Sequence, residues 1–153
     1  MIVFITRPAG ELCRYSVNDI SPDLPKRVLL VDDDESTLAS YARMLRLEGY
    51  LVSTAVSARE AFVEIESHSP DAILLDLRMP TTDGVGFLRE LRAMGAHTPV
   101  AIVTGVIEMD ESLQSALREL HAIVRWKPLW LEDLVVLVTT LLVEGPSDRP
   151  AAG

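Results

Sequence analysis

The stretch DAILLDLRMPTTDG, residues 71–84, places an aspartate directly after a continuous apolar run. Residues 72–75 predict a buried strand, and Asp76 follows it at once. A carboxylate is costly to desolvate unless charges or hydrogen bonds compensate it, so chains place one either in solvent or where it acts. Residues 79–84 are rich in turn formers and lead into a segment with apolar residues at helical spacing. The stretch therefore predicts a strand, a loop and a helix, with a carboxylate at the strand end.

The same alternation extends over most of the chain. Apolar runs predict strands at residues 27–31, 50–56, 72–75, 99–103 and 122–126. Helical spacing and capping residues predict helices at 36–48, from the capping box Ser57–Glu60, after residue 84, after Asp110, and at 131–143. Five strands alternating with five helices predict an α/β fold, a doubly wound parallel sheet with helices on both faces. The flavodoxin-like (βα)5 arrangement, with strand order 2-1-3-4-5, is common at this length.

Composition narrows the class of protein. A chain of 153 residues with 48% hydrophobic residues suits one domain with a sizeable core. The net charge of −9 argues against nucleic-acid binding, which needs a concentrated basic face. Cys13 is the only cysteine, so no intramolecular disulfide forms. The apolar run in MIVFITRPAG, residues 1–10, is too short to span a bilayer, and no basic segment precedes it as in a signal peptide. We therefore expect a cytoplasmic protein that contacts neither nucleic acid nor membrane.

The regular pattern predicts three regions. Residues 26–145 form the α/β domain, residues 1–25 an N-terminal extension, and residues 146–153 a tail with the composition of a disordered terminus. Ile2 to Ile5 would suit an additional edge strand, whereas the prolines and glycine of the extension favour a loosely attached segment.

Polar residues follow four of the predicted strands at their carboxyl ends. These are Asp32 and Asp33 after the first strand, Asp76 after the third, Thr104 after the fourth and Lys127 after the fifth. In the predicted order the first and third strands are neighbours, and the crevice at their carboxyl ends is where such sheets bind ligands. Adjacent carboxylates repel unless a cation joins them, and oxygen ligands without a Cys or His cluster favour Mg²⁺ over zinc. A carboxylate nucleophile, a divalent cation, a lysine and a hydroxyl suit in-line phosphoryl transfer, so Asp76 is predicted to accept a phosphoryl group.

Four fragments at suitable spacings carry a family resemblance. They are VLLVDDDE (28–35), DAILLDLRMPTTDG (71–84), AIVTG (101–105) and VRWKP (124–128). Over residues 26–145 the chain resembles the receiver domain of two-component response regulators, of the stand-alone type to which the chemotaxis regulator belongs. The resemblance implies that Asp76 is the phosphoacceptor and also contacts the metal. It implies that Asp33 binds Mg²⁺ directly, that Asp32 binds it largely through water, and that the backbone carbonyl of Arg78 is a third protein ligand.

The resemblance also implies how the phosphoryl group is sensed. Lys127 would pair with its oxygens, Thr104 would move to hydrogen-bond them, and Gly105 would leave room above it. Members of the family often have a cis peptide at the position of Lys127–Pro128. One position departs from the family: Val124 stands where an aromatic switch residue is frequent, so the coupling of Thr104 to an aromatic side chain does not carry over.

Two features have competing interpretations. Asp34 suits the start of a helix, and Asp83 suits a turn or the start of a helix, better than a ligand position. The segment at residues 131–143 is apolar almost all the way round, whereas a helix that covers one face of a sheet needs only a stripe. It indicates either a broad core face with some exposed aliphatic residues or a surface for a partner or a homodimer.

The functional prediction is a stand-alone receiver without an attached output domain, a switch rather than an enzyme. A histidine kinase or a phosphotransfer protein would phosphorylate Asp76 with Mg²⁺ bound, and a target protein would bind the surface of the fourth helix, fifth strand and fifth helix. One alternative is a receiver-like binding module that is not phosphorylated. The other is a Mg²⁺-dependent phosphohydrolase, although Arg78 stands where a second acid would be needed and no cap-sized insertion is present.

Overall fold

The sheet is the one that the alternating pattern predicts. The structure, a computed structural model, describes residues 2–6, 10, 12–16, 24–80, 82–105 and 108–144. Its strands are β1 (Ile2–Thr6), β2 (Leu12–Ser16), β3 (Arg27–Val31), β4 (Leu51–Ala55), β5 (Ala72–Leu75), β6 (Arg78–Met79), β7 (Thr82–Asp83), β8 (Val100–Thr104) and β9 (Ala122–Trp126). Its helices are α1 (Glu35–Leu47), α2 (Ala58–His68), α3 (Gly84–Ala93), α4 (Glu111–Glu119) and α5 (Leu131–Glu144). Five parallel strands lie in the order β4-β3-β5-β8-β9, which is 2-1-3-4-5 when these strands are counted alone. The flavodoxin-like prediction is confirmed.

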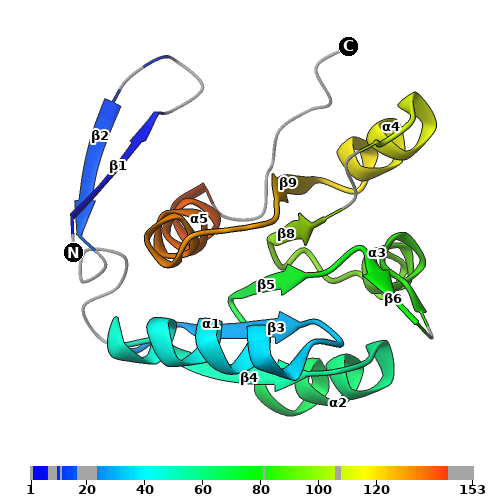
Figure 1. The fold of residues 1–153 in the computed structure, drawn as a ribbon, viewed down its shortest axis with the longest axis horizontal. Coiled ribbons are helices and arrows are strands. Elements are labelled where there is room, and N and C mark those ends of the chain that lie inside the picture. The colour runs from blue at the N-terminus through cyan, green and yellow to red at the C-terminus, as the bar shows by residue number, and fades with distance from the viewer. Residues whose placement is uncertain are drawn as a thin grey trace.

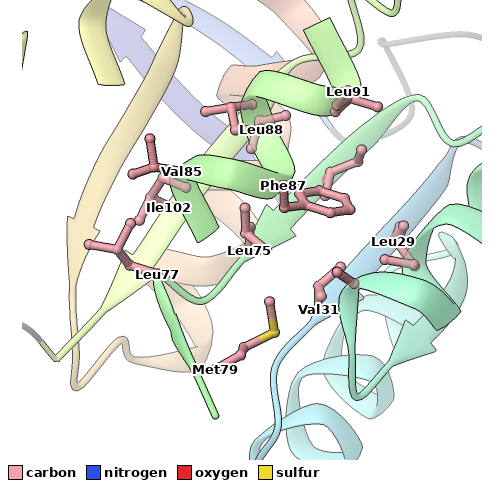
Figure 2. Packing of buried hydrophobic residues seen from close by; sticks show 14 of the residues in the cluster. Leu29, Val31, Leu75, Leu77, Met79, Val85, Phe87, Leu88, Leu91 and Ile102 are labelled. Atoms are coloured by element: carbon pink, nitrogen blue, oxygen red, sulfur yellow. The ribbon is translucent and has the colours of Figure 1, made fainter. Parts of the chain in front are cut away.

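Helices cover both faces of this sheet (Figure 1). Successive strand residues point to opposite faces, so the central strands, which are apolar without interruption, are buried on both sides. Leu29 and Val31 pack with residues of α2, α3 and α4, while Val28 and Leu30 pack with residues of α1 and α5. Figure 2 shows Phe87 and Leu88 of α3 beside Leu75 in the first of these clusters. The two cores fix the sheet, and the sheet fixes the positions of its carboxyl-end loops.

Capping side chains set where most of the helices begin. The hydroxyl of Ser57 accepts a hydrogen bond from the Glu60 amide at 3.2 Å, and a Glu60 carboxylate oxygen accepts one from the Val56 amide at 3.0 Å. The sequence had predicted this capping box. Asp110 accepts from the Leu113 amide at 2.7 Å, and Asp83 accepts from the Val85 amide at 3.1 Å. The predictions that Asp83 and Asp110 cap helices are therefore confirmed.

The N-terminal residues form a hairpin of their own. Ile2–Thr6 is a strand, but β1 pairs antiparallel with β2 and does not extend the five-stranded sheet. The edge-strand interpretation of Ile2 to Ile5 is thus wrong, because the strand finds a local partner through a short connection. The hairpin contacts α5, which lies between it and the sheet (Figure 1). The predicted tail, residues 146–153, lies outside the described residues.

No helix in the described part of the chain combines the length and the apolar character needed to cross a bilayer.

Candidate metal and phosphoacceptor site

The register of the central strands brings two aspartates together. Val31 of β3 pairs with Leu75 of β5, so the next residues, Asp32 and Asp76, leave the sheet side by side. The Asp76 amide donates to the Val31 carbonyl at 2.8 Å, and the Asp32 amide donates to the Ala55 carbonyl at 3.1 Å. Both residues are therefore held by backbone bonds that extend the strand pairing, which gives their carboxylates fixed positions.

Three carboxylates converge at this edge. Asp32, Asp33 and Asp76 each offer an oxygen, and these oxygens all lie within 4.8 Å of one another. Asp32 is only 6% exposed and Asp76 only 9%, whereas Asp33 is exposed. Oxygen donors this close, with no Cys or His among them, suit a small hard cation such as Mg²⁺. Two buried ligands and one exposed ligand leave the site open to solvent on one side, as a partly hydrated Mg²⁺ requires.

Lys127 places a positive charge among these acids. Its ammonium lies 2.7 Å from Asp32 Oδ2 and 3.3 Å from Asp76 Oδ2. Its backbone amide donates to the Thr104 carbonyl at 2.8 Å, which continues the β8–β9 pairing and brings the lysine to the same edge of the sheet. The Lys127–Pro128 peptide bond is cis, as the family resemblance implied.

The electrostatic environment affects two of these groups. Burial raises the pKa of the Asp76 carboxyl, and the negative charge of Asp32 adds to this effect; the Arg78 amide and Lys127 oppose it. For Lys127, burial alone would lower the pKa of the ammonium. Its contacts with Asp32 and Asp76 outweigh burial, so the pKa is raised and the lysine stays charged. Asp76 is thus an acid whose ionised form is costly even beside the ammonium of Lys127, and a bound metal cation would offset that cost.

Backbone amides complete the hydrogen bonding of the two buried carboxylates. The Asp34 amide donates to Asp32 Oδ1 at 2.9 Å, and the Arg78 amide donates to Asp76 Oδ1 at 3.2 Å. Arg78 lies in the small β6–β7 hairpin, where it pairs with Asp83. Its amide is therefore placed beside the predicted phosphoacceptor, and the ligand role of its carbonyl stays a prediction.

The side chain of Asp34 caps a helix, whereas those of Asp32 and Asp33 face the cluster of carboxylates. Its carboxylate accepts from the Ser36 amide at 3.0 Å and from the Thr37 hydroxyl at 2.7 Å, so it caps α1. The side chain is therefore not one of the three converging carboxylates. This confirms the interpretation of Asp34 as a helix-start residue.

The three predicted switch residues occupy different environments. Thr104 is fully buried at the end of β8, and Gly105 follows it. A Cβ added at Gly105 would meet no atom of the described residues within 4 Å, so these residues leave open space at this strand end. Val124 is partly buried and packs against the cluster that contains α3 and α4. The aromatic residue of this strand, Trp126, is instead exposed beside Lys127.

Sequence reasoning missed one residue that supports the site. Gly84 packs so tightly on the loop after β5 that an added Cβ would lie 2.9 Å from Leu77 Cα and 3.1 Å from the Asp76 carbonyl oxygen. The Gly84 amide also donates to the Leu77 carbonyl at 3.1 Å. The DG pair at positions 83–84 suggested only a turn, although a glycine close after the nucleophile is also a signal for close backbone packing.

Comparison with known proteins agrees with this geometry. The sequence model of the response regulator receiver domain matches residues 28–139, the span that contains all three carboxylates and Lys127. The chain belongs to this family. Among curated relatives, the transcriptional regulatory protein PrrA of Mycobacterium tuberculosis is 41% identical over 119 residues, which are 76% of this chain and 49% of that protein. The response regulator MprA of Mycobacterium sp. (strain KMS) is 35% identical over 136 residues, 84% of this chain and 57% of that protein.

Solved structures give the same family. A receiver domain protein described as CheY-like, from Methanospirillum hungatei JF-1, has a TM-score of 0.73 and 28% identity, and the match covers 79% of this chain and 96% of that one. The chemotaxis response regulator CheY4 of Vibrio cholerae has a TM-score of 0.68 and 27% identity, with 77% and 99% covered. This receiver chain spans about half the length of the curated relatives it matches, whereas it covers almost all of these two structures.

Proposed function

We propose that this receiver is a phosphorylation-controlled switch in which Asp76 accepts a phosphoryl group from a histidine kinase or a histidine phosphotransfer protein, with Mg²⁺ as cofactor. The observation that carries the proposal is the convergence of Asp32, Asp33 and Asp76 within 4.8 Å of one another, beside the ammonium of Lys127. A nucleophile, a place for a divalent cation and a fixed positive charge are the parts that phosphoryl transfer needs.

The residues divide between metal binding and transfer. Asp33 would bind Mg²⁺ directly, Asp32 largely through water, and the Arg78 carbonyl would complete the protein ligands together with Asp76. Bound Mg²⁺ supplies charge neutralisation for the phosphoryl oxygens. An oxygen of ionised Asp76 attacks the phosphorus of the donor phosphohistidine; the P–O bond forms, the P–N bond breaks, and the electron pair leaves with the donor imidazole. The product is an acyl phosphate on Asp76.

Lys127 and Thr104 would bind the phosphoryl group on Asp76 and respond to its presence. Lys127 is already within 3.3 Å of Asp76 and would pair with the phosphoryl oxygens. Thr104 would turn toward them, with the open space at Gly105 giving access to the acyl phosphate. Because Val124 replaces the usual aromatic residue, the response would reach the surface through the loops after β5 and β8 without the rotation of a ring at that position.

A protein target would recognise the surface of α4, β9 and α5. β9 lies at the edge of the sheet, and the exposed side chains of Trp126 and Trp130 lie on either side of Lys127 in the sequence. Aromatic side chains are enriched where proteins bind one another. This region is therefore the proposed place where the state of Asp76 is communicated to an output protein.

Labelling with a small phosphodonor tests the proposal. Acetyl phosphate with Mg²⁺ should phosphorylate the protein at one site, and Asp76→Asn should abolish the labelling. Asp71→Asn is the matched control, because Asp71 precedes the same strand at its opposite end, where it accepts a hydrogen bond from the Arg27 amide. Labelling of Asp76→Asn at the rate of the unchanged protein would remove Asp76 from the role. No labelling and no Mg²⁺ binding at millimolar concentration would instead favour the unphosphorylated binding module.

A further inference from the structure

A groove lies at the end of the sheet opposite the carboxylate cluster. It is bounded by the first residues of β3 and β4 and by the last turns of α1 and α2. Its volume is about 320 Å³, which is within the range of small-molecule sites. The carboxylates, in contrast, follow the carboxyl ends of β3 and β5. The groove is therefore separate from the proposed metal and phosphoacceptor site.

Basic side chains predominate in this groove, although the chain as a whole is acidic. Arg27, Arg46 and His68 line it, whereas no acidic residue of the described part of the chain does. Arg46 and His68 belong to the last turns of α1 and α2, where a positive charge stabilises the end of a helix. Arg27 begins a strand and has no such role. Helix ends therefore account for only part of this basic cluster.

The turn after α1 places the guanidinium of Arg46 against β4. Gly49 has a φ of +94°, and the chain reverses there, so that the Tyr50 amide donates to the Leu45 carbonyl at 3.1 Å. An Nη2 hydrogen of Arg46 is donated to the carbonyl of Val52, which also lines the groove, at 2.9 Å. This bond uses one of the five N–H donors of a guanidinium, whose planar fork matches the oxygens of a phosphate. Arg46 is thus held in place beside the groove with donors left for a ligand.

The first residues of β4 add apolar surface and a backbone donor. The Leu51 amide donates to the Lys26 carbonyl at 2.9 Å, so the next residue, Val52, turns its backbone N–H away from β3. Among the described strands β4 has a neighbour on one side only, so this N–H lies at an open edge of the sheet (Figure 1). The side chain of Leu51 is 43% exposed, and both Leu51 and Val52 line the groove. The basic residues therefore adjoin an aliphatic surface.

Two carboxylates contact the basic residues of the groove. Glu64 Oε2 lies 2.9 Å from Nδ1 of His68. Asp71 Oδ2 accepts a hydrogen bond at 2.8 Å from the backbone amide of Arg27, and this bond holds the start of β3. His68 is therefore the base that already has a carboxylate on its ring, and the two arginines carry the positive charge that a ligand would meet.

We propose that this groove binds a small organic phosphate monoester, with its phosphate at Arg27 and Arg46 and its apolar part on Leu51 and Val52. Two guanidinium groups suit a doubly charged phosphate better than a singly charged carboxylate, because each can donate two parallel hydrogen bonds to its oxygens. The aliphatic lining favours an ester over inorganic phosphate. The site requires neither Asp76 nor Mg²⁺, so it is independent of the proposed phosphorylation.

Phenyl phosphate is the probe, because it combines a phosphate monoester with one apolar ring. It is titrated into the full chain in EDTA, so that no metal at the carboxylate cluster competes for the phosphate, and NMR follows the backbone amides of Leu51, Val52 and Ser53. We expect saturable shifts of these amides with a Kd of about 1 mM or below. Inorganic phosphate, which lacks the ring, and benzoate, which carries a single charge, should each bind at least about fivefold more weakly.

Substitution of the two arginines tests the assignment. Arg27→Met and Arg46→Met each keep an aliphatic side chain but remove the charge and the fork, and each should weaken phenyl phosphate binding at least about tenfold. Arg43→Met is the matched control, because it removes the same charge from an exposed position of α1 outside the groove, and the Kd should change less than about twofold. Arg46 also bonds the Val52 carbonyl, so Arg27→Met keeps the test decisive if Arg46→Met disturbs β4.

Three results would overturn the proposal. The first is the absence of saturable shifts with phenyl phosphate up to about 10 mM. The second is a Kd that neither Arg27→Met nor Arg46→Met raises more than Arg43→Met does. The third is benzoate binding as tightly as phenyl phosphate, which would exclude recognition of a doubly charged phosphate.

Discussion

The ammonium of Lys127 is bound most closely by Asp32, at 2.7 Å, and lies 3.3 Å from Asp76. In this structure the lysine therefore neutralises a proposed metal ligand more directly than the proposed phosphoacceptor. Because Mg²⁺ would take over the charge of Asp32, metal binding and the release of Lys127 toward Asp76 are expected to be coupled. The lysine and the metal would therefore compete for the carboxylate of Asp32 before they act together on a phosphoryl group.

The first prediction follows from this competition. Lys127→Met should tighten Mg²⁺ binding by about tenfold, because a unit charge near 4 Å from a divalent ion costs ~2 kcal/mol even in water. The same change should slow labelling by acetyl phosphate about a hundredfold, since it removes a charge that stabilises the transferred group. Tryptophan fluorescence can follow the Mg²⁺ titration because Trp126 adjoins the lysine. Lys26→Met is the control, being the only other lysine of the chain. Weaker Mg²⁺ binding in the Lys127 variant would contradict the competition.

Substitutions at the adjacent residues Asp33 and Asp34 should have different effects: one should lower Mg²⁺ affinity, and the other should lower thermal stability. Asp33→Ala removes a proposed Mg²⁺ ligand that has little structural contact, so Mg²⁺ affinity should fall by at least about tenfold while Tm changes little. Asp34→Ala removes the cap of α1, so Tm should fall by a few degrees while Mg²⁺ affinity changes less than about threefold. Isothermal titration and thermal unfolding measure both quantities on each variant. The assignment fails if Asp34→Ala weakens Mg²⁺ binding more than Asp33→Ala does.

Much of the fold and site could be predicted because it rests on local patterns. The uninterrupted apolar runs around Leu29 and Leu74 indicated strands buried on both faces, and the structure shows their alternate residues in two separate cores. The polar residues at the strand ends then had to share one edge, and the Val31–Leu75 pairing places Asp32 beside Asp76. Parallel strand order and right-handed connections were therefore enough to predict that these strand ends meet at one edge of the sheet.

Other features depend on contacts that a sequence pattern does not specify. Alternating apolar residues from Ile2 to Ile5 indicate a strand, but they do not indicate whether its partner is the sheet or a nearby segment. The breadth of the apolar surface of α5 suggested a partner, but not that the chain supplies one itself. The closer pairing of Lys127 with Asp32 than with Asp76 depends on differences of a few tenths of an ångström, which residue types cannot indicate.

Substitution of Gly84 should reduce stability, whereas substitution of Gly86, the next glycine in α3, should not. Gly84→Ala places a Cβ against the backbone of Asp76 and Leu77, so it should cost about 1–3 kcal/mol of stability and slow the labelling of Asp76. Gly86→Ala is the matched control, since its added Cβ would lie 3.9 Å from the nearest atoms, the Cβ and Oδ2 of Asp83. Alanine favours the helix there, and stability should rise by about 0.5–1 kcal/mol. Urea unfolding at constant m-value measures both changes. Equal effects of the two substitutions would exclude close packing at Gly84 as the cause.

The raised pKa of Asp76 predicts how metal-free stability depends on pH. Because burial raises the pKa of its carboxyl above the ordinary value of 3.8, the folded protein binds this proton more tightly than the unfolded chain does. The resulting stabilisation is complete below pH 3.8 and is lost as pH rises through the higher folded pKa. At pH 7 in EDTA, Asp76→Asn should therefore have a higher Tm than the unchanged protein, and the difference should narrow toward pH 4.

Mg²⁺ should reverse the order of the Tm values of Asp76→Asn and the unchanged protein. This reversal would identify the desolvated carboxylate of Asp76 as the cause of the difference. Mg²⁺ at ten times its Kd should add about 1.4 kcal/mol to the stability of the unchanged protein, because only the folded state presents the three carboxylates together. Asp76→Asn should gain less, since it has lost a ligand and a charge, while Asp71→Asn should respond like the unchanged protein. Thermal unfolding with EDTA or Mg²⁺ from pH 4 to pH 8 measures all of these differences. If Asp76→Asn were less stable than the unchanged protein in EDTA at pH 7, the ionised carboxylate would be stabilising the fold, and desolvation could not be what prepares it for reaction.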